Sequence, residues 1–390
     1  MLNITSYIKY IPFLVLSIIV FLSCQEVYNP DDIDSSELIP VVNCRITNRT
    51  DTIELNLYWA APLHGYKQYI NNADITISDD SGNSIKLENG SAGRYYFYNR
   101  IKYTKMVNVL VPTETGTISL TYPTDTFKIL FPINEGRSYF ARILLEDGTI
   151  IESIPAVMNP VASIDSVYAK IDDNYNLSYD YDGEIRATKV RGLRTYMDIS
   201  SPNKQKSYYY FKSKVVRQTS TVDSDIGATL YCQVYPVYND DLIINSSEND
   251  GIKEVVKKQE IDFLEYIYIP SMNNSAAVNT VGWVMLTEIY SIDSLVYSYY
   301  YDTKKITEAE GNIFDPVPYQ IKGNLRCLTD TTKVVLGTFE VASVTNDTIG
   351  FFWMPEMKNY LYKRKTYVTD RVTWAQCVGI ESPEWFNFGI

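Results

Sequence analysis

Few residues of this chain could act as an acid, a base or a nucleophile. His64 is the single histidine among 390 residues, and it lies in the segment PLHG, where proline and glycine indicate a loop. One imidazole excludes two-histidine zinc sites, and a Ser–His–Asp hydrolase would depend on His64 as its sole base, without a GxSxG motif. We therefore interpret His64 as a solvated loop residue and predict that the protein is not an enzyme and has no catalytic residues.

Acidic residues are the next candidates, and they occur in three adjacent pairs: Asp79-Asp80, Asp172-Asp173 and Asp240-Asp241. Neighbouring residues on a strand point to opposite faces, so an adjacent pair seldom supplies the two carboxylates that a glycosidase needs. We interpret these pairs as turn residues. Asp180, Asp182 and Glu184 could offer oxygens to Ca²⁺, but they lack the spacing of an EF-hand loop. The sequence thus predicts no metal site and no cofactor.

Composition excludes one class of partner. The chain carries 35 Lys+Arg against 47 Asp+Glu, a formal net charge of −12. Binding to nucleic acid requires clustered positive charge that neutralises phosphates, so nucleic acid is not an expected partner. With 45% hydrophobic and 21% charged residues, 390 residues are enough for two domains with their own cores.

The N-terminal residues indicate export. Ile11–Leu22 is apolar except for Ser17, and 12 residues at about 1.5 Å each are too short to cross a hydrocarbon core of about 30 Å. The stretch is typical of a signal peptide, and it ends in Phe21-Leu22-Ser23-Cys24. This ending resembles the lipobox of bacterial lipoproteins, in which the cysteine is acylated and becomes the first residue. We predict a signal peptide over residues 1–23 and lipidation at Cys24; the alternative is an ordinary signal peptide with an accidental cysteine.

Residues 24–36 predict a short tether, because they are polar and acidic with one proline. Acidic residues soon after a lipidated cysteine resemble the signal that sends some lipoproteins to the outer face of the outer membrane. A solvated linker that carries no localisation signal would also explain these acidic residues. Acyl chains contribute about 0.8 kcal/mol per buried CH₂, so a multiply acylated terminus is a stable anchor. The expected location is the cell outer membrane, with the protein held by its lipid and exposed at the surface.

Four cysteines remain after Cys24: Cys44, Cys232, Cys327 and Cys377. An even number in an exported chain permits disulfides, and four cysteines allow three connectivities that the sequence does not distinguish. None forms a CxxC pair, which argues against zinc. One bridge at most, or buried free thiols, are the two expectations left open.

Alternating apolar and polar residues predict a mainly β fold. Thr52–Trp59 alternates in this way, and Ile75 and Ile77, followed by the turn residues 79–83, predict a hairpin. Asp147-Gly148 predicts another tight turn. Further short strands are expected at Tyr95–Val111, Thr117–Tyr122, Phe127–Phe131, Arg137–Glu146 and Thr149–Ser153. The length and spacing of these strands predict an immunoglobulin-like or transthyretin-like β-sandwich over residues 37–157.

Residues 158–390 predict a larger β-rich domain, after a boundary marked by Pro155 and Pro160. Strands are expected at Ser163–Ile171, Lys189–Ser200 and Ser207–Val216. Apolar residues at three- and four-residue spacing predict one amphipathic helix at about 288–308. Ser291 is its expected N-cap, Lys304 and Lys305 suit its C-terminal dipole, and Gly311 would close it.

The 34 tyrosines leave a second functional reading open. Tyrosine suits strands, since its ring packs while its hydroxyl reaches solvent. Tyrosine and tryptophan also build carbohydrate platforms, so a glycan-binding surface module is the alternative function. A glycosidase-type enzyme is a weaker third alternative, because nothing in the sequence predicts its pair of carboxylates.

Motifs downstream of the predicted helix resemble a known family. They are GNIFDPVP at Gly311–Pro318, IKGNL at Ile321–Leu325 and VLGTF at Val335–Phe339. Weaker matches are Pro40-Val41-Val42, Ala73–Ile77, Gly82-Asn83, Gly93-Arg94-Tyr95, Trp374, Cys377, Pro383 and Trp385. In this order, behind a lipobox, they are similar to the lipoprotein family catalogued as domain of unknown function 4249. Two positions depart from its pattern: Thr338 replaces the usual tyrosine, and Cys377 lacks a second cysteine nearby.

The resemblance implies an outer-membrane or surface lipoprotein of Bacteroidota-type bacteria, often encoded beside a TonB-dependent receptor. It supplies no catalytic residues and leaves the binding residues unknown. We therefore expect a non-enzymatic, lipid-anchored protein that is accessory to a TonB-dependent outer-membrane receptor in nutrient binding or uptake. Gly323 and Gly337 lie between strand-like runs, where glycine allows a turn, a bulge or a close backbone approach.

Overall fold

The computed structural model describes residues 38–60, 68–113, 116–179, 184–202, 206–223, 228–233, 237–266, 268–269, 278–308, 321–354 and 360–365. These residues form strands in four sheets and a single helix, so the expected mainly β class is confirmed. The structure does not assign the N-terminal sheets to an immunoglobulin-like or transthyretin-like type. The domain boundary near residue 157 stays a prediction.

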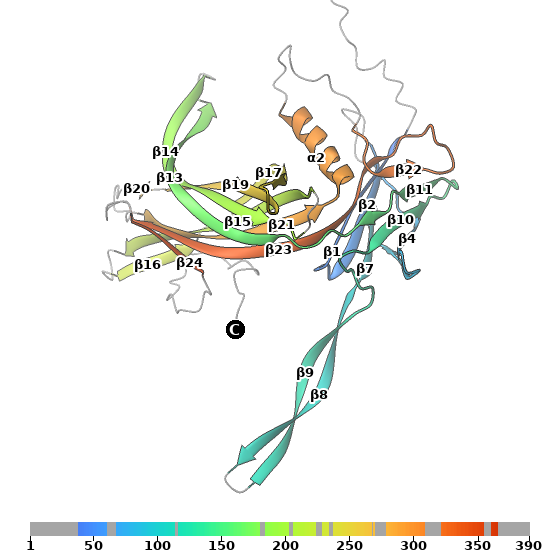
Figure 1. The fold of residues 1–390 in the computed structure, drawn as a ribbon, viewed down its shortest axis with the longest axis horizontal. Helices are drawn as coiled ribbons and strands as arrows, with labels where there is room; N and C mark the ends of the chain where they lie inside the picture. Colours follow the sequence, from blue (N-terminus) through green and yellow to red (C-terminus); the bar gives the residue numbers. More distant parts are fainter. Residues whose placement is uncertain are drawn as a thin grey trace, which may run out of the picture. The chain divides into compact units, whose positions relative to one another are not determined.

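The largest sheet has 12 strands in the described part of the chain, and its longest strand is β23 (Figure 1). Its main path runs β16-β15-β21-β23-β1-β2-β7-β6, and β3, β17, β20 and β24 pair off this path. The strands are β1 Pro40–Thr47, β2 Thr52–Trp59, β3 Gln68–Tyr69, β6 Glu88–Asn89, β7 Arg94–Tyr98, β15 Tyr208–Asp223, β16 Ala228–Gln233, β17 Val237–Ser246, β20 Tyr268–Ile269, β21 Val278–Ile292, β23 Leu336–Met354 and β24 Tyr360–Lys365.

The remaining described strands form three smaller sheets. The six-stranded sheet holds β4 Asp74–Asp79, β5 Ser84–Lys86, β10 Ser138–Leu144, β11 Ile150–Ser153, β12 Ala156–Val157 and β22 Leu325–Cys327. The four-stranded sheet holds β13 Ser163–Tyr179, β14 Ile185–Ser200, β18 Glu248–Asn249 and β19 Glu254–Glu265. The two-stranded sheet holds β8 Arg100–Thr113 and β9 Gly116–Ile129, which pair only with each other among the described strands (Figure 1).

The described residues form two large hydrophobic cores between these sheets, and a smaller buried cluster includes Val296 of the helix. In the first, alternate residues of β2 (Ile53, Leu55 and Leu57) pack with Ile75 and Ile77 of β4, and all five side chains are fully buried. This confirms the alternation read from the sequence, and the turn after β4 contains Gly82 with a φ of 85° as expected. In the second core, β15, β21 and β23 of the large sheet pack against β13, β14 and β19. Each core therefore draws on the large sheet and on one smaller sheet.

The strand β23 belongs to both cores. Its residues Leu336–Ala342 pair in parallel with β1, and Ser343–Phe352 pair antiparallel with β21. Phe339 accordingly packs in the first core and Phe351 in the second. Residues beyond 320 thus complete the sheets formed by residues 40–157, which short-range sequence patterns do not reveal.

The structure corrects the predicted strands between residues 95 and 131. We expected several short sandwich strands, but the chain forms the short β7 and then the long hairpin β8–β9. Asn99 causes the break, because its buried side chain donates to Thr50 O and accepts from Phe131 N at 2.8 Å. Pro123 does not end β9, since a proline is tolerated on a strand where its nitrogen faces away from the paired neighbour.

The predicted helix begins later than expected. Helix α2 spans Ser294–Thr307, and Asp293, not Ser291, is its N-cap, accepting hydrogen bonds from Leu295 N and Val296 N. Residues 288–292 belong to β21, where Ile289 is buried in the second core, so the helical spacing at that end was misleading. Lys304 and Lys305 lie in the last turn as predicted. Gly311 lies outside the described residues.

Two family-motif glycines mark close backbone contacts, as the sequence suggested. A Cβ on Gly323 would lie 1.7 Å from Gly337 O, and a Cβ on Gly337 would lie 2.0 Å from Val42 O. Between them, the buried Asn324 side chain donates to Phe339 O at 2.7 Å and accepts from Phe339 N at 2.9 Å. The amide therefore satisfies both backbone groups of Phe339. These contacts hold the segment before β22 against β23 and β23 against β1.

We predict that Gly337→Ala destabilises the protein far more than Gly148→Ala. Both glycines have a left-handed backbone, with φ of 88° and 84°. A Cβ at Gly148 meets nothing within 4 Å, so that variant should lose about 1 kcal/mol of unfolding free energy from backbone strain alone. Gly337→Ala adds a clash with a backbone oxygen and should lose more than about 3 kcal/mol. Equal urea midpoints for the two variants would contradict the close-contact interpretation.

Candidate functional site

Several of the residues considered for chemistry lie outside the described part of the chain. This holds for Cys24, His64, Asp180 and Asp182. Glu184 is described and lies just before β14. No group of three potential metal-ligating side chains occurs among the residues that the structure describes. Within the same residues, no helix has the length and apolarity needed to cross a membrane.

The acidic pairs have different roles. Asp79 confirms the turn interpretation, because its carboxylate accepts from Ser81 N and Asn83 N at 2.9 Å. Burial acts to raise the pKa of Asp79, but these hydrogen bonds and Arg137 outweigh it and lower that pKa. For Asp172-Asp173 the turn interpretation is wrong, since both residues lie within β13.

Cross-strand salt bridges explain the second pair. Asp172 binds Arg194 at 2.7 Å and Asp173 binds Lys189 at 2.8 Å. The third pair, Asp240-Asp241, lies within the strand β17 and is also not a turn.

Two of the four remaining cysteines are buried free thiols. Cys44 and Cys327 both pack in the first core and are not bridged. Burial raises the pKa of the Cys44 thiol, with a further contribution from Glu340, so this thiol stays protonated and unreactive. The side chain of Cys232 and the whole of Cys377 lie outside the described residues.

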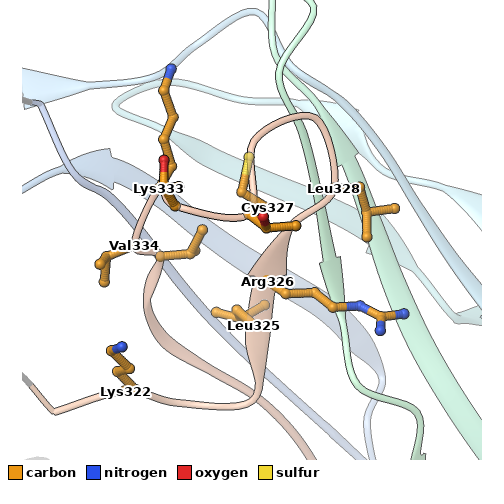
Figure 2. A pocket seen from close by; sticks show the side chains of 10 residues that line it. Lys322, Leu325, Arg326, Cys327, Leu328, Lys333 and Val334 are labelled. Atoms are coloured by element: carbon orange, nitrogen blue, oxygen red, sulfur yellow. The ribbon is translucent and has the colours of Figure 1, made fainter.

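A pocket of about 320 Å³ lies beside β22 (Figure 2). Its lining includes three cationic residues, Lys322, Arg326 and Lys333. Figure 2 shows their side chains pointing in different directions, and Arg326 is bound to Glu152 at 2.9 Å. The cations therefore do not converge on one anion, and the pocket offers no built binding site.

A charged cluster lies between α2 and the large sheet. Arg45 of β1 and Glu340 of β23 are register partners, and Arg45 Nε lies 2.8 Å from Glu340 Oε2. Tyr300 of α2 donates its hydroxyl hydrogen to Glu340 at 2.5 Å and accepts from Arg45 Nη2 at 2.9 Å. The guanidinium also lies 5.1 Å from the ring centroid of Tyr210 and 4.8 Å from that of Tyr290. The three groups together fix α2 on the sheet.

Burial and charge explain the titration of this cluster. Burial raises the pKa of Tyr300, and Glu340 raises it further, so its hydroxyl stays protonated and can donate. Burial disfavours the charged form of Arg45, but Glu340 outweighs this and raises the pKa of Arg45. These tyrosine rings contact cations and one another, so they do not form an open stacking surface for a sugar.

The most exposed apolar element is the β8–β9 hairpin, which we call the arm. Large apolar side chains lie in solvent along it, including Met106 at 61% exposure, Phe127 at 50% and Tyr122 at 49%. The register places Tyr103, Val107, Val109 and Tyr122 on one side, which we call the odd face. The sequence patterns predicted strands at Tyr95–Val111, Thr117–Tyr122 and Phe127–Phe131 but did not join them into one long hairpin.

We predict that Glu340→Ala strongly destabilises the protein. Glu340 is 2% exposed and its partner Arg45 is 27% exposed, so the variant leaves a largely buried guanidinium without its carboxylate. Breaking a buried pair in this way should cost about 3 kcal/mol of unfolding free energy. Asp125→Ala removes an exposed pair with Lys102 and should have a far smaller effect. A urea midpoint for Glu340→Ala that matches the Asp125→Ala midpoint would refute this.

Comparison with known proteins places the chain in a family. A search of curated proteins finds no match. The family model described as domain of unknown function (DUF4249) matches residues 26–348. This span includes β1, the arm, α2, the Gly323-Asn324 segment and Gly337. Since the match covers well over half of the 390 residues, the chain belongs to the DUF4249 family.

Proposed function

We propose that the protein is a non-enzymatic lipoprotein of the outer membrane, held by a lipid on Cys24 and accessory to a TonB-dependent receptor. The lipobox-like sequence before Cys24 supports the anchor. The arm is the observation that carries the role in partner binding.

The arm has the physical character of a protein-binding element. An isolated two-stranded hairpin is at best marginally stable in water, and this one exposes apolar side chains along its length. Contiguous exposed apolar surface is typical of interaction sites. Its two edges pair with no other strand in the part of the chain that the structure describes. This argues against insertion into lipid, where each unsatisfied backbone group costs several kcal/mol. A protein surface is the better partner, because it can cover the odd face.

We predict that Cys24→Ala abolishes stable membrane retention and leaves the fold intact. Cys24 lies outside the described residues, and both described cores consist of residues between Val42 and Phe351, which the substitution leaves unchanged. Without acyl chains, a chain with a formal net charge of −12 has no electrostatic reason to remain on an anionic membrane. Fractionation of cells with a blot for the mature chain measures this. A variant that is still processed after Ser23 and still pellets with membranes would overturn the lipid anchor.

We predict that the double variant Tyr103→Ser/Tyr122→Ser loses a β-barrel partner that co-purifies from detergent-solubilised outer membrane. Both side chains lie exposed on the odd face, so the change removes apolar contact area without touching a core. The matched control is Tyr175→Ser/Leu177→Ser, which changes two exposed apolar residues on β13 and should retain the partner. Recovery of no barrel with the wild-type protein would refute the accessory role. Equal recovery with both double variants would refute the odd face as the contact.

A further inference from the structure

The outer edge of β8 has backbone groups that pair with no other described strand. Arg100 N donates to Asp51 O at 3.0 Å, which shows that the N–H of Arg100 points away from β9. Antiparallel strands alternate, so the even-numbered residues of β8 all direct their N–H and C=O groups outward. The register Met106–Pro123 agrees, because a proline fits only where no ladder hydrogen bond is needed.

This open edge is bounded at both ends. At the base of the arm, Arg100 already uses its N–H on Asp51, and towards the tip Pro112 has no N–H to offer. The outward positions between these limits are Lys102, Thr104, Met106, Asn108 and Leu110. On β9, by contrast, Pro123 interrupts the outer edge in its middle. The arm therefore has one edge suited to strand addition and one that is blocked.

The open edge is complementary to itself. Its midpoint is Met106, so antiparallel pairing with a second copy about Met106 aligns all five outward positions. Thr104 then lies opposite Asn108, and Tyr103 lies opposite Val109, an aromatic and β-branched combination that stabilises sheets. Arg100, whose N–H is already used, lies opposite Pro112, which has none.

Neighbouring registers are less favourable. Moving the axis to Lys105 places two lysines directly opposite each other, and like charges in that position destabilise a sheet. Moving it to residue 107 places Lys102 opposite Pro112, which loses a hydrogen bond. Pairing about Met106 avoids both and makes about ten backbone hydrogen bonds, two for each aligned pair.

We propose that the protein forms a homodimer in which the β8 edges of two copies pair antiparallel about Met106. The two arms then form a continuous four-stranded sheet in the order β9-β8-β8-β9. Each chain enters and leaves its arm at Arg100 and Ile129, so the two copies extend from opposite ends of this sheet. The odd face stays open, so dimerisation does not depend on the accessory role proposed above and does not compete with it.

The test is sedimentation velocity of the purified mature protein in density-matched detergent, with two matched proline variants. Asn108 and Thr121 are register partners, both with outward N–H groups, and Thr121 Oγ1 donates to Asn108 Oδ1 at 2.6 Å. Asn108→Pro and Thr121→Pro therefore lose the same side-chain hydrogen bond and leave the β8–β9 ladder intact. Only Asn108→Pro blocks the open edge. We expect dimers for the wild type and for Thr121→Pro, and at least a tenfold weaker dimer for Asn108→Pro.

Cysteine cross-linking in intact membranes provides a second measurement. Met106→Cys places one thiol of each copy at the two-fold axis and should give a disulfide-linked dimer on mild oxidation, whereas Thr121→Cys should not. A monomeric wild type at tens of micromolar would overturn the proposal, as would a dimer that tolerates Asn108→Pro. If both proline variants lose the dimer, absence of the Met106→Cys cross-link would overturn it and presence would support it.

Discussion

The described structure depends on the path of β23 between two sets of partners. Its first residues pair with β1 in a parallel ladder, and its later residues pair with β21 in an antiparallel ladder. One uninterrupted backbone thereby joins the first core to the second, with Phe339 in one and Phe351 in the other. A break in this strand would divide the large sheet, which explains why the close contacts at Gly323, Asn324 and Gly337 gather around its start.

The charged cluster joins the helix α2 to the paired strands β1 and β23. Arg45 and Glu340 sit on the β1–β23 pair, and Tyr300 connects them to α2. A hydrophobic contact could hold the helix equally well, but it would not specify one orientation as strictly as three directed groups do. The helix also buries Val296 against Ile292 and Ala342, so packing and hydrogen bonding act on the same position.

Local sequence patterns predicted the parts of the fold that are set locally. The alternation in β2, the turn containing Gly82 and the basic end of α2 follow from neighbouring residues and were read correctly. The start of α2 was misread because Ile289 and Ile292 fit helical spacing and a buried strand equally well. The arm was only partly predicted, because no local pattern shows that Thr117–Tyr122 and Phe127–Phe131 belong to one strand, β9. The parallel β1–β23 pair could not be predicted, since no local pattern records a partner some 300 residues away, as between Asn48 and Val344.

That distant pairing has a consequence for the order in which the chain folds. A chain synthesised from its N-terminus presents β1 first and the residues of β23 that pair with it some 300 residues later. Until residue 342 has emerged, β1 keeps one edge without its neighbour, and the first core lacks Phe339 and Val341. Completion of the N-terminal sheets is therefore a late, non-local event, of the kind that slows folding and lengthens exposure of strand edges. Any mutation that delays the pairing of β23 prolongs the interval in which these strand edges stay open.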